Sequence, residues 1–115
     1  MILEIPINCD DPYFIQTTAI ESVAYRFEFV WNDREERWRM SILDMQDNYL
    51  LINIKLMPLI PLVKRYKING LFSGELIGIN MKNENEIPTR KNLGKDFKLI
   101  YVPVKDIKLI KEGKL

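Results

Sequence analysis

Apolar and polar residues alternate along much of this chain, most clearly between residues 25 and 42. Aromatic residues occupy every second position from Tyr25 to Trp31, and the alternation resumes from Trp38 to Ile42 after a polar turn. Successive side chains of a strand point to opposite faces, so a period of two indicates one buried face and one wet face. The pattern predicts an antiparallel hairpin whose core face consists of Tyr25, Phe27, Phe29, Trp31, Trp38, Met40 and Ile42.

The turn of this hairpin is expected to be a four-residue loop, Asp33–Glu36. A two-residue turn at this place would need positive φ at two non-glycine residues. A slip of the strands by two residues would keep the same faces, so the faces are better determined than the pairing. The four-residue loop pairs Trp31 with Trp38, Phe29 with Met40 and Phe27 with Ile42.

Short runs bounded by turn residues predict the remaining strands. The connection between the second and third strands is expected at Ala19–Glu21, and Gly78 indicates a bulge or a close backbone approach. The run Tyr49–Leu56 is apolar on both faces, which favours a central position covered on both sides. The expected strands are residues 3–7, 14–18, 22–31, 38–43, 49–56, 75–81, 97–103 and a short final one within 105–115.

No window of eleven or more residues has a helical period. The sequence therefore predicts an all-β fold. We expect a small single domain over residues 1–115, a β-barrel or closed β-sandwich of about six to seven mostly antiparallel strands.

Length and charge limit the classes of function. The 115 residues suit one domain with a modest core, and 47% hydrophobic with 29% charged residues is typical of a folded protein. The 17 basic and 16 acidic residues give a net charge of +1. Because nucleic-acid affinity depends on a clustered positive patch, we expect no nucleic-acid specificity.

The single cysteine, Cys9, excludes an intramolecular disulfide, and we expect a small half-buried residue near the first strand. The N-terminus has no basic region, and Glu4 and Pro6 interrupt its apolar run, so no signal peptide is expected. The longest apolar window, residues 49–63, is too short and too interrupted to span a bilayer. These features favour a reducing, soluble compartment.

The side chains needed for catalysis are largely missing. With no histidine there is no Ser-His-Asp or Cys-His pair, and metal sites lose their commonest ligand. Nothing in the spacing of the acidic pairs selects two carboxylates facing each other across a cleft, as a glycosidase requires. We therefore expect no enzyme. The acidic pairs, all in turns or loops, are Asp10 with Asp11, Asp44 with Asp47, and Glu84 with Glu86.

The apolar segment Met57–Val63 carries two prolines three residues apart, which favour extended backbone and exclude a helix. The Pro-x-x-Pro spacing occurs in ligands of SH3 domains, but those are exposed and have polar flanks. A buried or partner-facing apolar loop fits better. The basic run Lys64–Lys67 is either a solvated strand end or a contact for an acidic partner surface.

Proline lowers the cost of ordering a docking loop, so we predict that residues 57–66 contact neighbouring subunits. The alternative is that this loop folds back and caps its own barrel. The predicted interface residues are Met57, Pro58, Leu59, Ile60, Pro61, Leu62, Lys64, Arg65 and Tyr66.

Three parts of the chain, in this order and spacing, resemble the baseplate central plug proteins of contractile-tailed phages. The resemblance runs over about residues 2 to 104. The first part is the opening strand Leu3–Ile7, and the second is the hairpin from Tyr25 through Trp38, continuing into Ile42–Asp44. The third consists of Gly74–Gly78, Pro88–Arg90, Leu93–Gly94 and Leu99–Pro103.

The resemblance implies a structural virion protein that is made in the host cytoplasm and placed on the tail axis. It implies binding within the hub-spike assembly, closing the lumen until ejection, with hub, spike and other baseplate proteins as partners. It also implies a homo-oligomer in the assembled tail, with no catalysis and no cofactor. The rival classes are a tail-associated wall-degrading enzyme and a protein-binding β module of phage or cellular origin. Neighbouring tape-measure, hub and wedge genes would distinguish them.

Overall fold

The computed structural model describes residues 2–8, 11–59, 62–63 and 71–104. Every strand pairing is antiparallel. The strands form a three-stranded sheet of order β1-β7-β6 and a four-stranded sheet of order β2-β3-β4-β5. The predicted all-β class is confirmed. The seven strands are β1 (Leu3–Ile5), β2 (Tyr13–Ile20), β3 (Val23–Asn32), β4 (Arg37–Leu43), β5 (Tyr49–Lys55), β6 (Glu75–Asn80) and β7 (Phe97–Val102).

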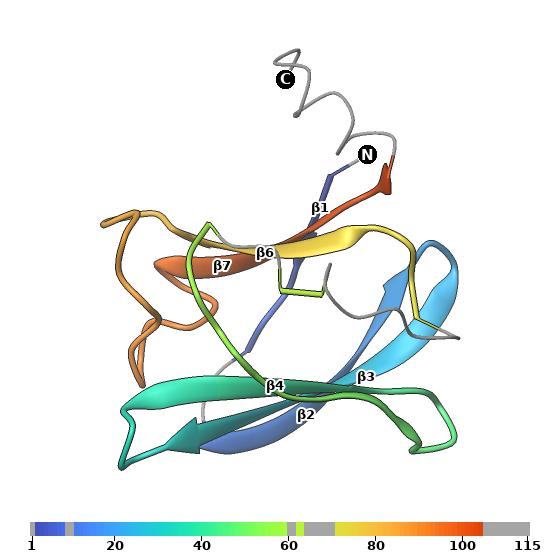
Figure 1. Cartoon of the computed structure of the whole chain (residues 1–115), viewed down its shortest axis with the longest axis horizontal. Coiled ribbons are helices and arrows are strands. Elements are labelled where there is room, and N and C mark those ends of the chain that lie inside the picture. Colours follow the sequence, from blue (N-terminus) through green and yellow to red (C-terminus); the bar gives the residue numbers. More distant parts are fainter. Residues whose placement is uncertain (1, 9–10, 60–61, 64–70, 105–115) are drawn as a thin grey trace.

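The two sheets lie in separate layers (Figure 1), and one apolar cluster draws its side chains from both of them. The four-stranded sheet contributes Phe27, Phe29 and Trp38, and the three-stranded sheet contributes Leu76 and Leu99, all completely buried. The hydrophobic core therefore lies between the sheets. The final strand expected within 105–115 and the environment expected for Cys9 lie outside the described residues.

The β3–β4 hairpin has the predicted loop and the predicted register, with Trp31 opposite Trp38, Phe29 opposite Met40 and Phe27 opposite Ile42. The predicted core face is buried, except that Trp31 is only half-buried at the turn end of the hairpin. Its ring meets that of Trp38 edge-on, with centroids 5.6 Å apart.

The central position predicted for residues 49–56 is wrong, because β5 is an edge strand. The register shifts between Leu51 and Ile54, where Asn53 has a φ of 53°. The bulge lets both Leu51 and Ile54 pack inward, although they are three residues apart. Ile52 is left 58% exposed, so the apolar run reflects a bulged strand and not burial on both faces.

The connection predicted at Ala19–Glu21 is one residue too early. β2 continues to Ile20, and the turn consists of Glu21 and Ser22, with φ values of 51° and 69°. Positive φ at both positions matches the twist of a two-residue hairpin. Neither residue is glycine or asparagine, so this turn has no local sequence signal.

Candidate interaction surfaces

The segment after β5 runs along the free edge of β6. Leu59 donates its N–H to the carbonyl of Gly78 at 2.8 Å, and Leu62 donates to that of Leu76 at 3.0 Å. Pro58 forms a parallel bridge with Gly78. This segment therefore carries the chain from one sheet to the other and satisfies backbone groups on the outer edge of β6.

Gly78 permits this close contact. A Cβ atom at this position would lie 2.5 Å from Cζ of Phe97 and 2.8 Å from the carbonyl oxygen of Met57. Both distances are shorter than side-chain carbon atoms tolerate, and one of the contacts is with backbone. The close approach predicted for Gly78 is confirmed.

The end of the described segment is anchored by a buried carboxylate. Glu75 is 4% exposed, and its Oε1 accepts the N–H of Val63 at 2.7 Å and that of Leu76 at 2.9 Å. A buried carboxylate requires such donors, because its desolvation is costly. Glu75 thus fixes the position of Val63 beside the start of β6.

The predicted interface residues differ in exposure. Leu62 is buried in the core of its own domain, as is the neighbouring Val63, whereas Leu59 is 54% exposed. Met57 and Pro58 are half-buried. Contact of this segment with a partner stays a prediction. Ile60, Pro61, Lys64, Arg65 and Tyr66 lie outside the described residues.

The outer face of the four-stranded sheet carries an acidic group between two tyrosines, a cluster that sequence reasoning missed. Tyr13 donates its hydroxyl to Oε2 of Glu28 at 2.7 Å, and the hydroxyl of Tyr49 lies 3.2 Å from the same oxygen. The hydrogen bond to Glu28 raises the pKa of Tyr13, and the charge of Glu28 raises the pKa of Tyr49. About half of each tyrosine is exposed, so this cluster belongs to the surface.

A different polar contact joins the two sheets. Tyr101 of β7 donates its hydroxyl to Oε2 of Glu21 at 2.9 Å and accepts the N–H of Gly74 at 3.0 Å. Burial, followed by the hydrogen bond to Glu21, raises the pKa of Tyr101 to about 12. The phenol therefore remains protonated and holds the β2–β3 turn against the other sheet.

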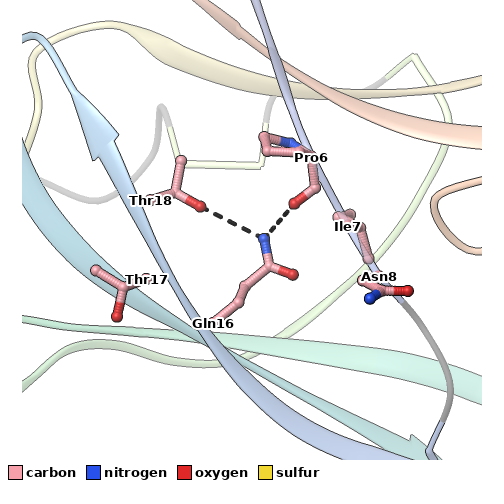
Figure 2. A pocket seen from close by; sticks show the side chains of 6 residues that line it. All are labelled: Pro6, Ile7, Asn8, Gln16, Thr17 and Thr18. Atoms are coloured by element: carbon pink, nitrogen blue, oxygen red, sulfur yellow. Dashed lines mark hydrogen bonds between the residues drawn. The ribbon is translucent and has the colours of Figure 1, made fainter.

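A cavity of about 350 Å³ lies between the chain after β1 and the middle of β2 (Figure 2). The side chain of Gln16 spans it, donating to the carbonyl of Pro6 and lying 3.4 Å from Oγ1 of Thr18. The six residues that line the cavity include no charged side chain. It is a seam between the two sheets.

Ligand chemistry is sparse in the described part of the chain. No cluster of three or more metal-ligating side chains occurs among the described residues. Within the same residues, no helix is long and apolar enough to cross a membrane. The acidic residues expected to be solvated in turns behave accordingly where they are described: Asp44 accepts the N–H groups of Gln46 and Asn48, and Asp47 pairs with Arg26.

Comparison with known proteins gives the family of this chain. The family model described as cyanophage baseplate Pam3 plug gp18 matches residues 2–105. The chain belongs to this baseplate plug family. No curated protein matches the chain.

Membership of the plug family makes the chain a structural component of a phage tail baseplate. Its place is the tail of the virion, in association with other baseplate proteins. The matched range covers all seven strands, so the family assignment applies to the whole described fold.

Proposed function

We propose that the chain is a plug on the axis of the phage tail, held within the hub-spike assembly and closing the lumen until ejection. The observation that carries this proposal is the family match over residues 2–105. The near-neutral charge supports it, because a plug beside the path of the genome should not bind nucleic acid tightly. This role requires neither catalysis nor a cofactor. Synthesis in the host cytoplasm and homo-oligomerisation in the assembled tail belong to the same proposal.

The two sheets, in this proposal, form a closed β-sandwich or barrel. On one side, the hydrogen bonds of Leu59 and Leu62 to β6 support closure through the chain itself. On the other side, the side chain of Gln16 reaches the carbonyl of Pro6 across the seam. A closed module of this kind keeps its shape when it is packed into an assembly.

The segment Met57–Tyr66 is proposed as the contact with the tail hub or with neighbouring subunits. Leu59 supports this most, because it is a half-exposed apolar side chain on a backbone that is already fixed. Pre-ordered backbone lowers the entropic cost of docking, so more of the apolar contact remains as affinity. The proposed surface also includes Ile60, Pro61, Lys64, Arg65 and Tyr66.

Substitution of Leu59 by Ser in the phage genome tests this proposal. We expect an unchanged melting temperature of the purified chain and about a tenfold fall in its copy number in purified tails, since about 1.4 kcal/mol of lost apolar contact corresponds to tenfold. Met81→Ser, which alters an apolar residue that is 66% exposed, is the matched control and should incorporate normally.

Two outcomes contradict different parts of the proposal. Normal incorporation of Leu59→Ser would overturn the role of the segment and leave the plug assignment intact. Absence of the wild-type chain from purified tails would overturn the plug assignment itself. Leu62→Ser should lower stability before it affects incorporation, because Leu62 is buried.

A further inference from the structure

The two sheets have four edge strands, β1, β6, β2 and β5. Three of these edges are protected against pairing with another chain. The segment at Leu59 and Leu62 covers β6. β5 carries the bulge at Asn53 and ends at Lys55. β1 has only three residues, and its Glu4 pairs with Lys98. Bulges, charges and short length are the usual protections of strand edges.

β2 has none of these protections. It is eight residues long, has no charged residue, proline or glycine, and pairs without a bulge along its whole length. Tyr13 and Ile15 are both about half exposed on it. Among the described residues, the chain after β1 makes no backbone hydrogen bond to this edge, and the Gln16 side chain crosses the cavity between them (Figure 2).

The backbone groups available on β2 follow from its ladder with β3. Trp31 donates its N–H to the carbonyl of Pro12 at 2.7 Å, which makes this pair a hydrogen-bonded one. Such pairs alternate along an antiparallel ladder, so residues 14, 16, 18 and 20 bond to β3. The N–H and C=O groups of Tyr13, Ile15, Thr17 and Ala19 therefore point away from β3, and no other backbone group among the described residues bonds to them.

We infer that β2 pairs with β2 of a second copy of this chain in an antiparallel, two-fold symmetric arrangement. With Gln16 on the two-fold axis, Tyr13 lies opposite Ala19 of the second copy and Ile15 opposite Thr17 of the second copy. This register uses all four free residues of each strand and forms about eight backbone hydrogen bonds.

Side-chain complementarity favours a second copy in this register. Each large residue faces a small one: Tyr13 faces Ala19, Ile15 faces Thr17, and Phe14 faces Thr18. An uncharged strand pairs with itself without like-charge repulsion. Because the contact is isologous and β5 is bulged, assembly stops at the dimer.

This inference assigns an interface to the homo-oligomer proposed above. Its test uses only the purified full chain. Sedimentation velocity over a dilution series should show a dimer for the wild type. Thr17→Pro should raise the dissociation constant at least about tenfold, since it removes one N–H from each side of the interface. Within one copy this N–H is unpaired, and proline is tolerated at such edge positions. Thr17→Val keeps the N–H and should remain dimeric.

Hydrogen exchange keeps the inference testable if Thr17→Pro does not fold. The wild-type amides of Tyr13, Ile15, Thr17 and Ala19 should be protected at high protein concentration and should lose protection on dilution, while those of residues 14, 16 and 18 stay protected. A wild type that is monomeric at all concentrations would overturn the inference, as would a folded Thr17→Pro variant that dimerises normally. Protection of the four amides only within the baseplate would assign the edge to a different protein and would also overturn it.

Discussion

The β3–β4 hairpin and segment 56–63 are both rich in apolar residues, but they bury them in different ways. In the hairpin every second residue packs inward, and Phe27, Phe29 and Trp38 are completely buried. In segment 56–63, Leu56 and Leu62 are buried while Leu59 is 54% exposed. β3 follows the strand period because its side chains point alternately into the core and toward the outer face. The segment follows the edge of β6, so its pattern of burial has no fixed period.

The largest effect should come from removing a core ring of the hairpin. Phe29→Ala should lower the free energy of unfolding by about 3–5 kcal/mol, because it leaves a cavity in a closely packed core. Arg26→Ala, on the opposite face of the same strand, should change it by less than about 0.5 kcal/mol. Urea denaturation of both variants measures the difference. Equal, small effects would show that the inward face has been assigned wrongly.

A smaller effect is expected where segment 56–63 meets β6. Gly78→Ala introduces a methyl group 2.8 Å from the carbonyl oxygen of Met57, and such overpacking typically costs about 1–3 kcal/mol. The segment should be displaced, so the amides of Leu59 and Leu62 should exchange faster than in the wild type. The amide of Phe29 serves as the internal control and should remain as protected as before. Unchanged exchange at Leu59 and Leu62 would mean that the edge contact does not depend on Gly78.

The smallest effect should arise at the hydrogen bond of Tyr101 to Glu21, which joins the two sheets. This contact involves neither the core of the hairpin nor segment 56–63. The pKa of Tyr101 rises from 10.0 to about 12, so the folded chain holds this proton more tightly than the unfolded chain. The associated stability is complete below about pH 10 and is lost as the pH rises toward 12. Tyr101→Phe should be less stable by about 0.5–1.5 kcal/mol near pH 8.

The pH dependence distinguishes this contact from simple packing. Between pH 10 and 12, Tyr101→Phe should lose less stability than the wild type, because it lacks the titrating phenol. Urea midpoints of both proteins at several pH values give the comparison. Parallel curves would show that the raised pKa contributes nothing to folding.

Sequence reasoning succeeded where local alternation determines the structure. The aromatic period gave the hairpin, its faces and its register, and Gly78 indicated the close backbone approach. It failed for β5, because a bulge at Asn53 changes the face of each following side chain without a glycine to mark it. It also missed the pairing of Tyr13 and Tyr49 with Glu28, since three residues on three strands come together only after the sheet has formed.

The candidate surfaces were predictable only in part, for the same reason. The two prolines drew attention to segment 57–66, but the burial of Leu62 and the exposure of Leu59 depend on which residues meet β6. The open edge of β2 depends on the strand order, which no pattern within residues 13–20 contains. Surfaces of this kind follow from tertiary arrangement and not from local period.

The contact between Trp38 and the loop after β6 gives the chain an optical signal. The indole Nε1 of Trp38 donates to the carbonyl of Thr89 at 2.8 Å, and the guanidinium carbon of Arg90 lies 5.7 Å from the centre of the Trp38 ring. The sequence has two tryptophans, and both are in this hairpin. Intrinsic fluorescence therefore reports on one place in the molecule. Any event that lifts Thr89 from the hairpin would expose the Trp38 indole to water and move the emission to longer wavelength, even while the strands remain paired.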